Sequence, residues 1–421
     1  MDSLGAPPSS VVRYYLFQAA DSIGFIWPVF TLFLLWNDLT YAQIGTLSAV
    51  SALLVVALEV PTGYVADRYG RRNALALGML AMTVSTAGFV VAETFAAFLV
   101  LYGLWALSLS LQSGTVDAWL YATLDGRGES DAFTRVRGRG GAVYQWSSAI
   151  TMVAGGLLYV SHPLYPFVAS AALNGLGFFV VLSMPRNAGF ESGELEGTVD
   201  LRESLAILRD RLNQPQIRLV VGYVALFFAV VSAADTYIQP ITVDVLEELA
   251  TDDSFVAAPV ALARVPEEAV LGFIYAGFAA IAALASDRAV AVRRSVGLQT
   301  ALAAIPVCVA LTLLLPRAFP LFAIPVFFLM KGTHELLKPL IAQFLNDRTG
   351  DAGRATVLSA ASMIYATVRA PLLPVVGFVA DTAGPLTAIG GLGGTFLIVA
   401  LVAVVIVVSF SADPAYRTLE R

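Results

Sequence analysis

Twelve apolar runs, each about 20 residues long and separated by polar segments, constrain this chain more than any other feature. About 20 apolar residues are the length that an α-helix needs to cross ~30 Å of hydrocarbon. Only helices fit here, because each backbone polar group in a bilayer must find its partner within its own segment. The predicted spans are 12–36, 41–66, 73–92, 96–121, 140–160, 165–184, 216–240, 269–286, 295–315, 320–344, 355–380 and 385–410.

The composition agrees with an all-α integral membrane protein. Hydrophobic residues make up 58% of the 421 residues and charged residues 13%, whereas soluble domains carry about 25% charged residues. The net charge of −6 argues against a nucleic-acid partner, which requires a basic surface. The first run is too long for a secretory signal, so we expect it to be retained as a helix.

The basic residues predict the orientation. If the N-terminus is cytoplasmic, 20 of the 25 Lys and Arg residues fall in cytoplasmic segments and two in outer loops. The positive-inside rule therefore places both termini in the cytoplasm, and we expect the plasma membrane as the location. The outer loop 241–268 is acidic, and its role is left open.

A long polar connection divides the spans into two sets of six. The expected domains are a bundle at 1–184, a cytoplasmic linker at 185–215 and a second bundle at 216–421. The linker contains an amphipathic stretch, 201–212, that we expect to lie along the membrane surface.

The two halves also repeat one another. Three matches occur in the same order at offsets of 214, 220 and 218 residues: Ala19–Ser22 with Ala233–Thr236, Asp67-Arg68 with Asp287-Arg288, and Gly114–Asp117 with Gly332–Glu335. Six helices repeated in one orientation predict two parallel bundles related by a pseudo-two-fold axis along the membrane normal, with a substrate path between them.

One loop carries a specific motif. The segment between the second and third spans has a Gly-x-x-x-Asp-Arg-x-Gly-Arg-Arg pattern formed by Gly63, Asp67, Arg68, Gly70, Arg71 and Arg72. This pattern resembles the signature loop of the major facilitator superfamily, and the helix count, orientation and repeat extend the resemblance over the whole chain. We expect Gly63 to allow close helix packing, Asp67 to face a helix N-terminus and Gly70 to allow the turn.

The resemblance implies a secondary transporter that works by alternating access, as a monomer, on a small-molecule substrate. Within the superfamily the chain is closest in character to drug:proton antiporters. Those proteins carry a Gly-Pro-x-x-Gly-Gly ending in helix 5, but here Met152 precedes Gly155-Gly156 in place of the proline. The second copy of the loop motif, Ala283–Arg294, lacks both glycines, which puts the contacts of a second gate in doubt.

Charged residues inside the spans are the candidate substrate and ion ligands. Each costs about 2.5–3.5 kcal/mol at mid-bilayer, so we expect them to face a cavity or each other. The set is Asp21, Asp235, Lys331, His334, Glu335 and Arg369. Asp21 and Asp235 occupy matched positions and could bind a proton or the substrate, or Asp21 could form a fixed salt bridge with Arg369.

The two lysines of the chain, Lys331 and Lys338, share one face of the tenth helix. Lys331 is expected either to bind substrate or to pair with Glu335. Arg369 could bind an anionic substrate or neutralise an acid. Asp117 is assigned to the gate, where we expect it to pair with Arg71.

Other chemistry is not expected. His334-Glu335-Leu-Leu-Lys338 lacks the second histidine of a zinc-protease motif, and no Gly-x-x-x-x-Gly-Lys-Ser/Thr loop for nucleotide hydrolysis occurs. We therefore predict no cofactor, no metal and no enzymatic activity.

Three functional hypotheses follow. The first is proton-coupled efflux of amphipathic compounds. The second is ion-coupled import of an organic anion or nutrient, bound by Lys331 and Arg369. The third, from another class, is a membrane sensor or scaffold that transports nothing. Sodium could replace the proton as coupling ion.

Overall fold

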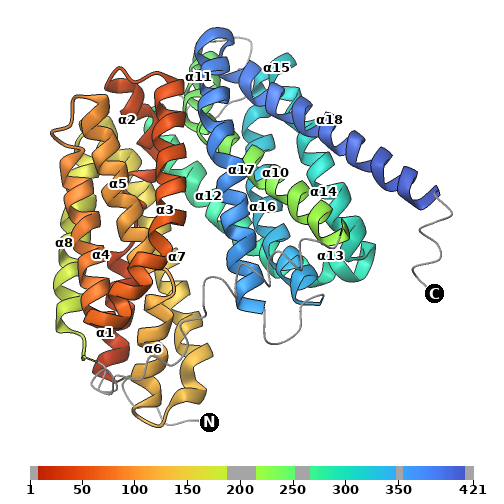
Figure 1. The fold of residues 1–421 in the computed structure, drawn as a ribbon. Helices are drawn as coiled ribbons and strands as arrows, with labels where there is room; N and C mark the ends of the chain where they lie inside the picture. Colours follow the sequence, from red (N-terminus) through yellow and green to blue (C-terminus); the bar gives the residue numbers. More distant parts are fainter. Residues whose placement is uncertain (1–7, 187–214, 252–265, 348–353, 413–421) are drawn as a thin grey trace. The chain divides into compact units, whose positions relative to one another are not determined.

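A computed structural model describes residues 8–186, 215–251, 266–347 and 354–412. Within these ranges the regular elements are helices (Figure 1). Contacts between residues divide the chain into two compact units. Unit 1 comprises Met1–Leu39, Thr46–Thr198 and Leu249–Ala279, and unit 2 comprises Thr40–Gly45, Val199–Glu248 and Ala280–Arg421.

Unit 1 is built around the packing of α4 against α5 and α8, while α1 packs against α7 and α8. Its buried core is rich in large aromatic side chains, which include Phe17, Phe33 and Trp119. Its elements are α1 (Ser9–Ala20), η1 (Trp27–Val29), α2 (Phe30–Trp36), most of α3 (Tyr41–Tyr69), α4 (Arg71–Gly88), α5 (Phe95–Gln112), α6 (Thr115–Asp125), η2 (Ser130–Ala132), α7 (Phe133–Ser161) and α8 (Tyr165–Ser183).

Unit 2 is built around α10, which packs against α17 and α18, and around α14, which packs against α16 and α18. Its elements are α10 (Pro215–Asp235), α11 (Ile238–Thr251), the end of α12 (Glu267–Asp287), α13 (Ala289–Val296), α14 (Leu298–Thr312), α15 (Leu315–Ala318), η5 (Pro320–Phe322), α16 (Ala323–Asn346), α17 (Arg354–Ala383) and α18 (Pro385–Ala412).

Two long helices belong partly to each unit. The first residues of α3, Thr40–Gly45, pack within unit 2, while the rest of the helix packs within unit 1. The start of α12 packs within unit 1, and the helix continues from Ala280 in unit 2. The helices α3 and α12 correspond to the second predicted span of each sequence repeat. The two repeats therefore also match in having this span divided between the two units.

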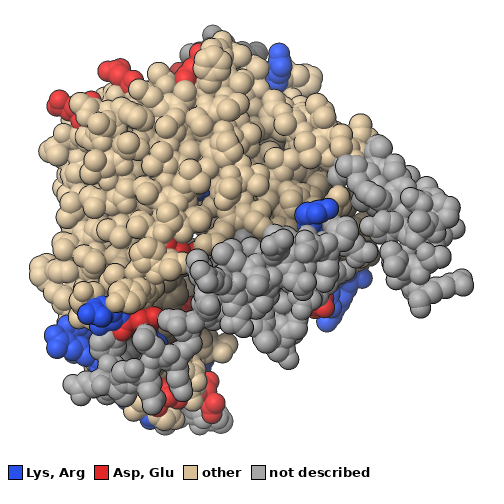
Figure 2. Space-filling view, viewed as in Figure 1, with Lys and Arg blue, Asp and Glu red and all other residues tan. Residues whose placement is uncertain are grey.

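The twelve predicted spans each coincide with one helix or with a helix broken in two. Eight stretches in the described ranges are long and apolar enough to cross a bilayer by length and composition. The helices α7 and α16 are long enough, but α16 carries two Lys and one Glu, and α7 begins with three Arg and continues with several polar residues. On the face of unit 1 visible in Figure 2, charged side chains gather toward the helix ends and leave a broad uncharged surface between them, as lipid contact requires.

Two boundaries differ from the prediction. The acidic segment expected as a loop from residue 241 is helical through Thr251 in α11, and α12 already begins at Glu267. Asp244, Glu247 and Glu248 therefore project from a helix. The amphipathic stretch expected at 201–212 lies outside the described residues.

Candidate functional site

The first span is interrupted at its predicted functional residue. The helix α1 ends at Ala20, Asp21 follows as its C-cap, and the next helical turn begins at Trp27. The interruption packs against α7, where the buried Ser22 hydroxyl lies 3.1 Å from the Ser148 hydroxyl and 3.0 Å from the Thr151 hydroxyl. The unpaired backbone groups at such a break require polar neighbours, which α7 supplies.

Glycine makes this close contact possible. A Cβ atom added to Gly155 would lie 2.0 Å from the carbonyl oxygen of Phe25, which is closer than side chains pack. A Cβ atom on Gly24 would lie 2.5 Å from the carbonyl oxygen of Ser148. The interrupted segment can therefore contact α7 only with glycine at both positions.

We expect Gly155→Ala to destabilise the protein by about 1–3 kcal/mol, because the added methyl group must displace backbone in the interrupted segment. Thermal unfolding of the purified protein measures the effect. The control is Gly141→Ala on the same helix, where an added Cβ meets nothing within 4 Å. That control is expected to be neutral or slightly stabilising, and equal midpoints for the two variants would contradict the close packing.

Asp21 lies in a polar but uncharged environment in unit 1. The residue is half-buried, and its carboxyl group hydrogen-bonds the side chain of Gln112, which is buried in α5. Tyr144 of α7 is close enough to interact electrostatically with Asp21 and hydrogen-bonds Ser148. Among the described residues, Asp21 forms no ion pair. A carboxylate removed from water without a cationic partner is costly, so this site favours a bound proton or cation.

The matched residue of the second repeat also ends a helix. The helix α10 ends at Asp235, and α11 begins at Ile238 after a two-residue interruption. The repeated Ala-Ala-Asp-Ser/Thr sequence therefore marks a helix break in both halves. The third repeat match is less symmetric, since Gly114 separates α5 from α6 with φ of 69°, while Gly332 lies within the continuous α16.

Three charged side chains meet in unit 2. Lys331 of α16 forms an ion pair with Asp235, and both side chains are about one-fifth exposed. Arg369 of α17 interacts electrostatically with Asp235 and donates a hydrogen bond of 3.2 Å to the Ser232 hydroxyl of α10. Within the described part of the chain, the buried Nε of Arg369 has no hydrogen-bond partner. Two cations and one carboxylate leave a surplus positive charge and a free donor at this site.

A second cluster lies one turn further along α16. Glu335 accepts a hydrogen bond of 2.6 Å from Lys338 and lies 3.1 Å from His334 Nδ1. The predicted alternative of a Lys331–Glu335 pair is therefore wrong for this structure, because α10 brings Asp235 to Lys331 instead. The ring of Phe228 packs edge-on against both His334 and Tyr365, which places aromatic surface beside the charges.

The signature loop is held by its arginines. Gly70 has φ of 91°, the left-handed conformation that favours glycine, and it caps the start of α4. Arg71 donates to the carbonyl of Ala118, and Arg72 lies 3.4 Å from the carbonyls of Leu182 and Met184 at the end of α8. Asp67 and Arg68 are exposed at the end of α3, and Arg68 donates to the hydroxyl of Tyr64.

Two expectations for the gate residues differ from the structure. Asp117 pairs with Arg137 through two hydrogen bonds of 2.8 and 2.9 Å, and not with Arg71. These bonds raise the pKa of the Arg137 guanidinium. Gly63 was expected to allow close packing, but among the described residues nothing lies within 4 Å of a Cβ built there.

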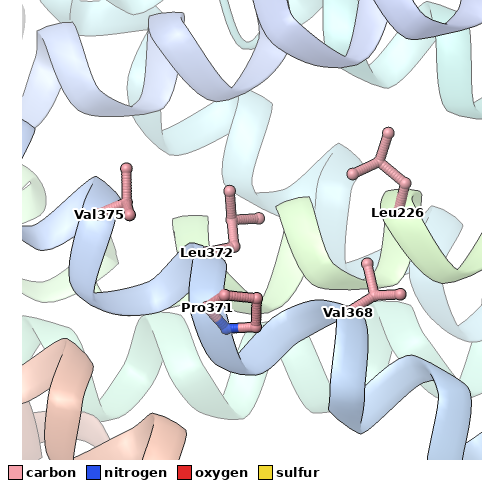
Figure 3. Close-up of a pocket in the computed structure, with 5 residues that line it drawn as sticks. All are labelled: Leu226, Val368, Pro371, Leu372 and Val375. Atoms are coloured by element: carbon pink, nitrogen blue, oxygen red, sulfur yellow. The ribbon is translucent and has the colours of Figure 1, made fainter.

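An apolar groove in unit 2 is a weaker candidate for substrate binding. It lies between α10 and α17 and is lined by Leu226, Val368, Pro371, Leu372 and Val375 (Figure 3). The groove offers no side chain that could orient a polar ligand. Within the described ranges, no group of three or more His, Cys, Asp or Glu residues could hold a metal ion.

Sequence reasoning missed the neutral partners of the charged residues. Gln112, Tyr144 and Ser232 contact Asp21 or Arg369, but each is a neutral residue with no charge to mark it as a partner in the sequence. The available signal was Gln112, a large polar side chain within the predicted span 96–121. Arg137 was counted only among the basic residues of a loop.

Comparison with known proteins decides the family. The sequence profile of the Major Facilitator Superfamily matches residues 15–370. The chain belongs to the major facilitator superfamily. Because this match covers most of the chain, the family and the all-helical, multi-pass membrane fold expected from the signature loop are confirmed.

Several relatives of this major facilitator are informative. It is 26% identical over 416 residues to the uncharacterized MFS-type transporter YxaM of Bacillus subtilis (strain 168), with 96% of each chain covered. It resembles the crystal structure of the nucleoside transporter NupG with a TM-score of 0.76 at 12% identity, over 94% of this chain and 97% of that one. The D-xylose-proton symporter gives a TM-score of 0.64 at 12% identity, over 94% and 95%. At such low identity, the solved structures show the fold alone.

Proposed function

We propose that this major facilitator is a proton-coupled secondary transporter of small amphipathic organic anions, with no catalytic activity of its own. The observation that carries the proposal is the unequal charge of the two matched helix breaks. Among the described residues the partners of Asp21 are neutral, whereas Asp235 faces two cations, Lys331 and Arg369. The first arrangement suits a proton and the second an anion.

The surplus positive charge sets the substrate class. Because Lys331 pairs with Asp235, Arg369 retains an unpartnered donor within the described residues. A guanidinium binds a carboxylate or phosphate through parallel hydrogen bonds. Phe228 of α10 and Tyr365 of α17 lie one helical turn from Ser232 and Arg369, and their rings pack against each other. These rings supply apolar surface for the rest of an amphipathic solute.

A second candidate is efflux of amphipathic compounds in exchange for protons. The resemblance of the sequence to drug:proton antiporters supports this candidate. The aromatic surface at Phe228 and Tyr365 favours it. The charge of the cluster favours import of an anion together with a proton, since the proton would compensate the charge of the solute. Sodium as coupling ion, and a sensor that transports nothing, are the remaining alternatives.

The basic residues support a proposed orientation with both termini in the cytoplasm and a location in the plasma membrane. The proposed domain division remains 1–184, 185–215 and 216–421. Most of the proposed linker, residues 187–214, lies outside the described residues.

Proteoliposomes loaded with a pH-sensitive dye test the proposal. A panel of organic anions and lipophilic cations is added in proton gradients and in sodium gradients. We expect anions to trigger proton movement into the vesicles along with the solute. Proton release triggered by lipophilic cations would favour efflux, movement that requires sodium would change the coupling ion, and no movement with any compound would favour the sensor.

A further inference from the structure

The helices α3 and α17 contact each other through their backbones. A Cβ atom on Gly45 would lie 2.3 Å from the carbonyl oxygen of Leu373, and one on Gly377 would lie 2.3 Å from the carbonyl oxygen of Tyr41. Unit 1 repeats this contact between α12 and α7. There, a Cβ atom would lie 2.6 Å from a backbone oxygen both at Gly272 and at Gly156.

The two matched contacts differ in how the start of the second helix is capped. The Asp381 carboxylate, four residues after Gly377, accepts hydrogen bonds of 2.8 Å from the Tyr41 amide and 2.9 Å from the Ala42 amide. These amides belong to the first turn of α3, where no backbone partner exists, and a carboxylate there also faces the positive end of the helix dipole. In α7 the position four residues after Gly156 is Val160.

The sequence around Asp381 repeats the signature loop. Gly377–Gly384 reads Gly-Phe-Val-Ala-Asp-Thr-Ala-Gly, and Gly63–Gly70 reads Gly-Tyr-Val-Ala-Asp-Arg-Tyr-Gly. Both segments end a helix at a glycine of positive φ, 85° at Gly384 and 91° at Gly70, and a new helix begins at the next residue. The segment Gly377–Gly384 thus places its aspartate at the opposite end of α3 from Asp67.

We propose that Asp381 is a latch that holds the N-terminus of α3 on α17, and that its release is a step of the transport cycle. The helix α3 starts in unit 2 and continues in unit 1, so a cap on its first turn attaches α17 to a helix whose remaining length belongs to the other unit. Alternating access requires the two halves to move against each other. The latch therefore determines how often the end of α3 leaves α17, and Asp381 acts as a positioning residue.

The proposed latch depends on the proposal that the protein is a transporter. It does not depend on which substrate or coupling ion the protein uses. In Asp381→Asn the charge that faces the helix dipole and one of the two accepting oxygens are lost, which shifts an equilibrium by about threefold to thirtyfold. Asp381→Asn keeps the size of the side chain and loses its charge, so this variant tests the latch without creating a cavity. The control is Thr382→Ala, because Thr382 is exposed and, within the ranges that the structure describes, its hydroxyl bonds carbonyls of its own helix, those of Phe378 and Val379.

The test measures distances in the full-length protein, with spin labels at Leu53→Cys on α3 and Val375→Cys on α17. Both side chains are exposed, and the native Cys308 is replaced by serine. We expect Asp381→Asn to move at least a threefold larger share of molecules into a second distance population, with Asp381→Glu closer to the wild type and Thr382→Ala equal to it. Identical distance distributions for the wild type and Asp381→Asn, in protein of unchanged thermal stability, would overturn the latch.

Discussion

Replacement of Asp21 by asparagine is expected to abolish substrate-driven proton movement while the protein remains folded. In the described part of the chain, Gln112 and Tyr144 are the polar partners of the carboxyl group. Asparagine can keep the hydrogen bond to Gln112 but cannot exchange a proton. We expect the rate of coupled proton movement to fall by at least about 100-fold, or about 2.7 kcal/mol. The measurement uses the dye-loaded proteoliposomes with the anion that gives the strongest signal.

The control for Asp21 is Glu93→Gln, which removes a carboxyl group from an exposed turn between helices. Its proton movement should equal that of the wild type. Solute exchange distinguishes a loss of proton coupling from a loss of substrate binding. In this measurement, labelled solute inside the vesicles exchanges with unlabelled solute outside, without a proton gradient. Exchange should persist in Asp21→Asn, and proton movement that survives this substitution would remove Asp21 from the coupling mechanism.

Replacement of Arg369 by glutamine is expected to weaken substrate binding more than any other single change in unit 2. The substitution removes the free Nε donor and the surplus charge, yet leaves the pair of Lys331 with Asp235 in place. A charge-assisted hydrogen bond contributes about 1.5–3 kcal/mol. We therefore expect the anion concentration at half-maximal transport to rise by about 10-fold to 150-fold.

Arg369→Lys should lose less, because it keeps the charge without the planar arrangement of donors. Lys338→Gln is the matched control, since Lys338 is half-exposed and already paired with Glu335. If anion transport is equal in Arg369→Gln and in the wild type, the cluster does not bind the substrate. If lipophilic cations are transported better by Arg369→Gln, the efflux hypothesis gains support.

The residues that carry charge could be found from the sequence, but their partners could not. Lys331 and Glu335 lie one turn apart on α16, so helical spacing made them the natural pair. In the structure Lys331 pairs with Asp235 of another helix, 96 positions earlier in the chain, and Glu335 pairs with Lys338. Asp117 is a second example, because it was expected to pair with Arg71 and in the structure pairs with Arg137.

The repeat was visible in the sequence, but its meaning was not. Ala19–Ser22 and Ala233–Thr236 were recognised as matched segments, and the structure adds that each contains the end of a helix. Apolar runs predict that a segment spans the membrane, but a short interruption barely changes hydropathy. The break at Asp21 follows from the close packing of Gly24 and Gly155 between segments more than 100 residues apart.

The sequence by itself determined that this chain spans the membrane many times, that its halves repeat and that it carries the signature loop of its family. These properties depend on run length, local pattern and charge along the chain. Only the tertiary structure decided which acid meets which base, that Asp381 caps α3, and that one helix break holds a lone carboxyl group while the other holds surplus cations. Such pairings depend on how helix faces pack against one another. Because a charge removed from water is energetically costly, the packing must provide each buried charged side chain with a partner, a proton or a ligand.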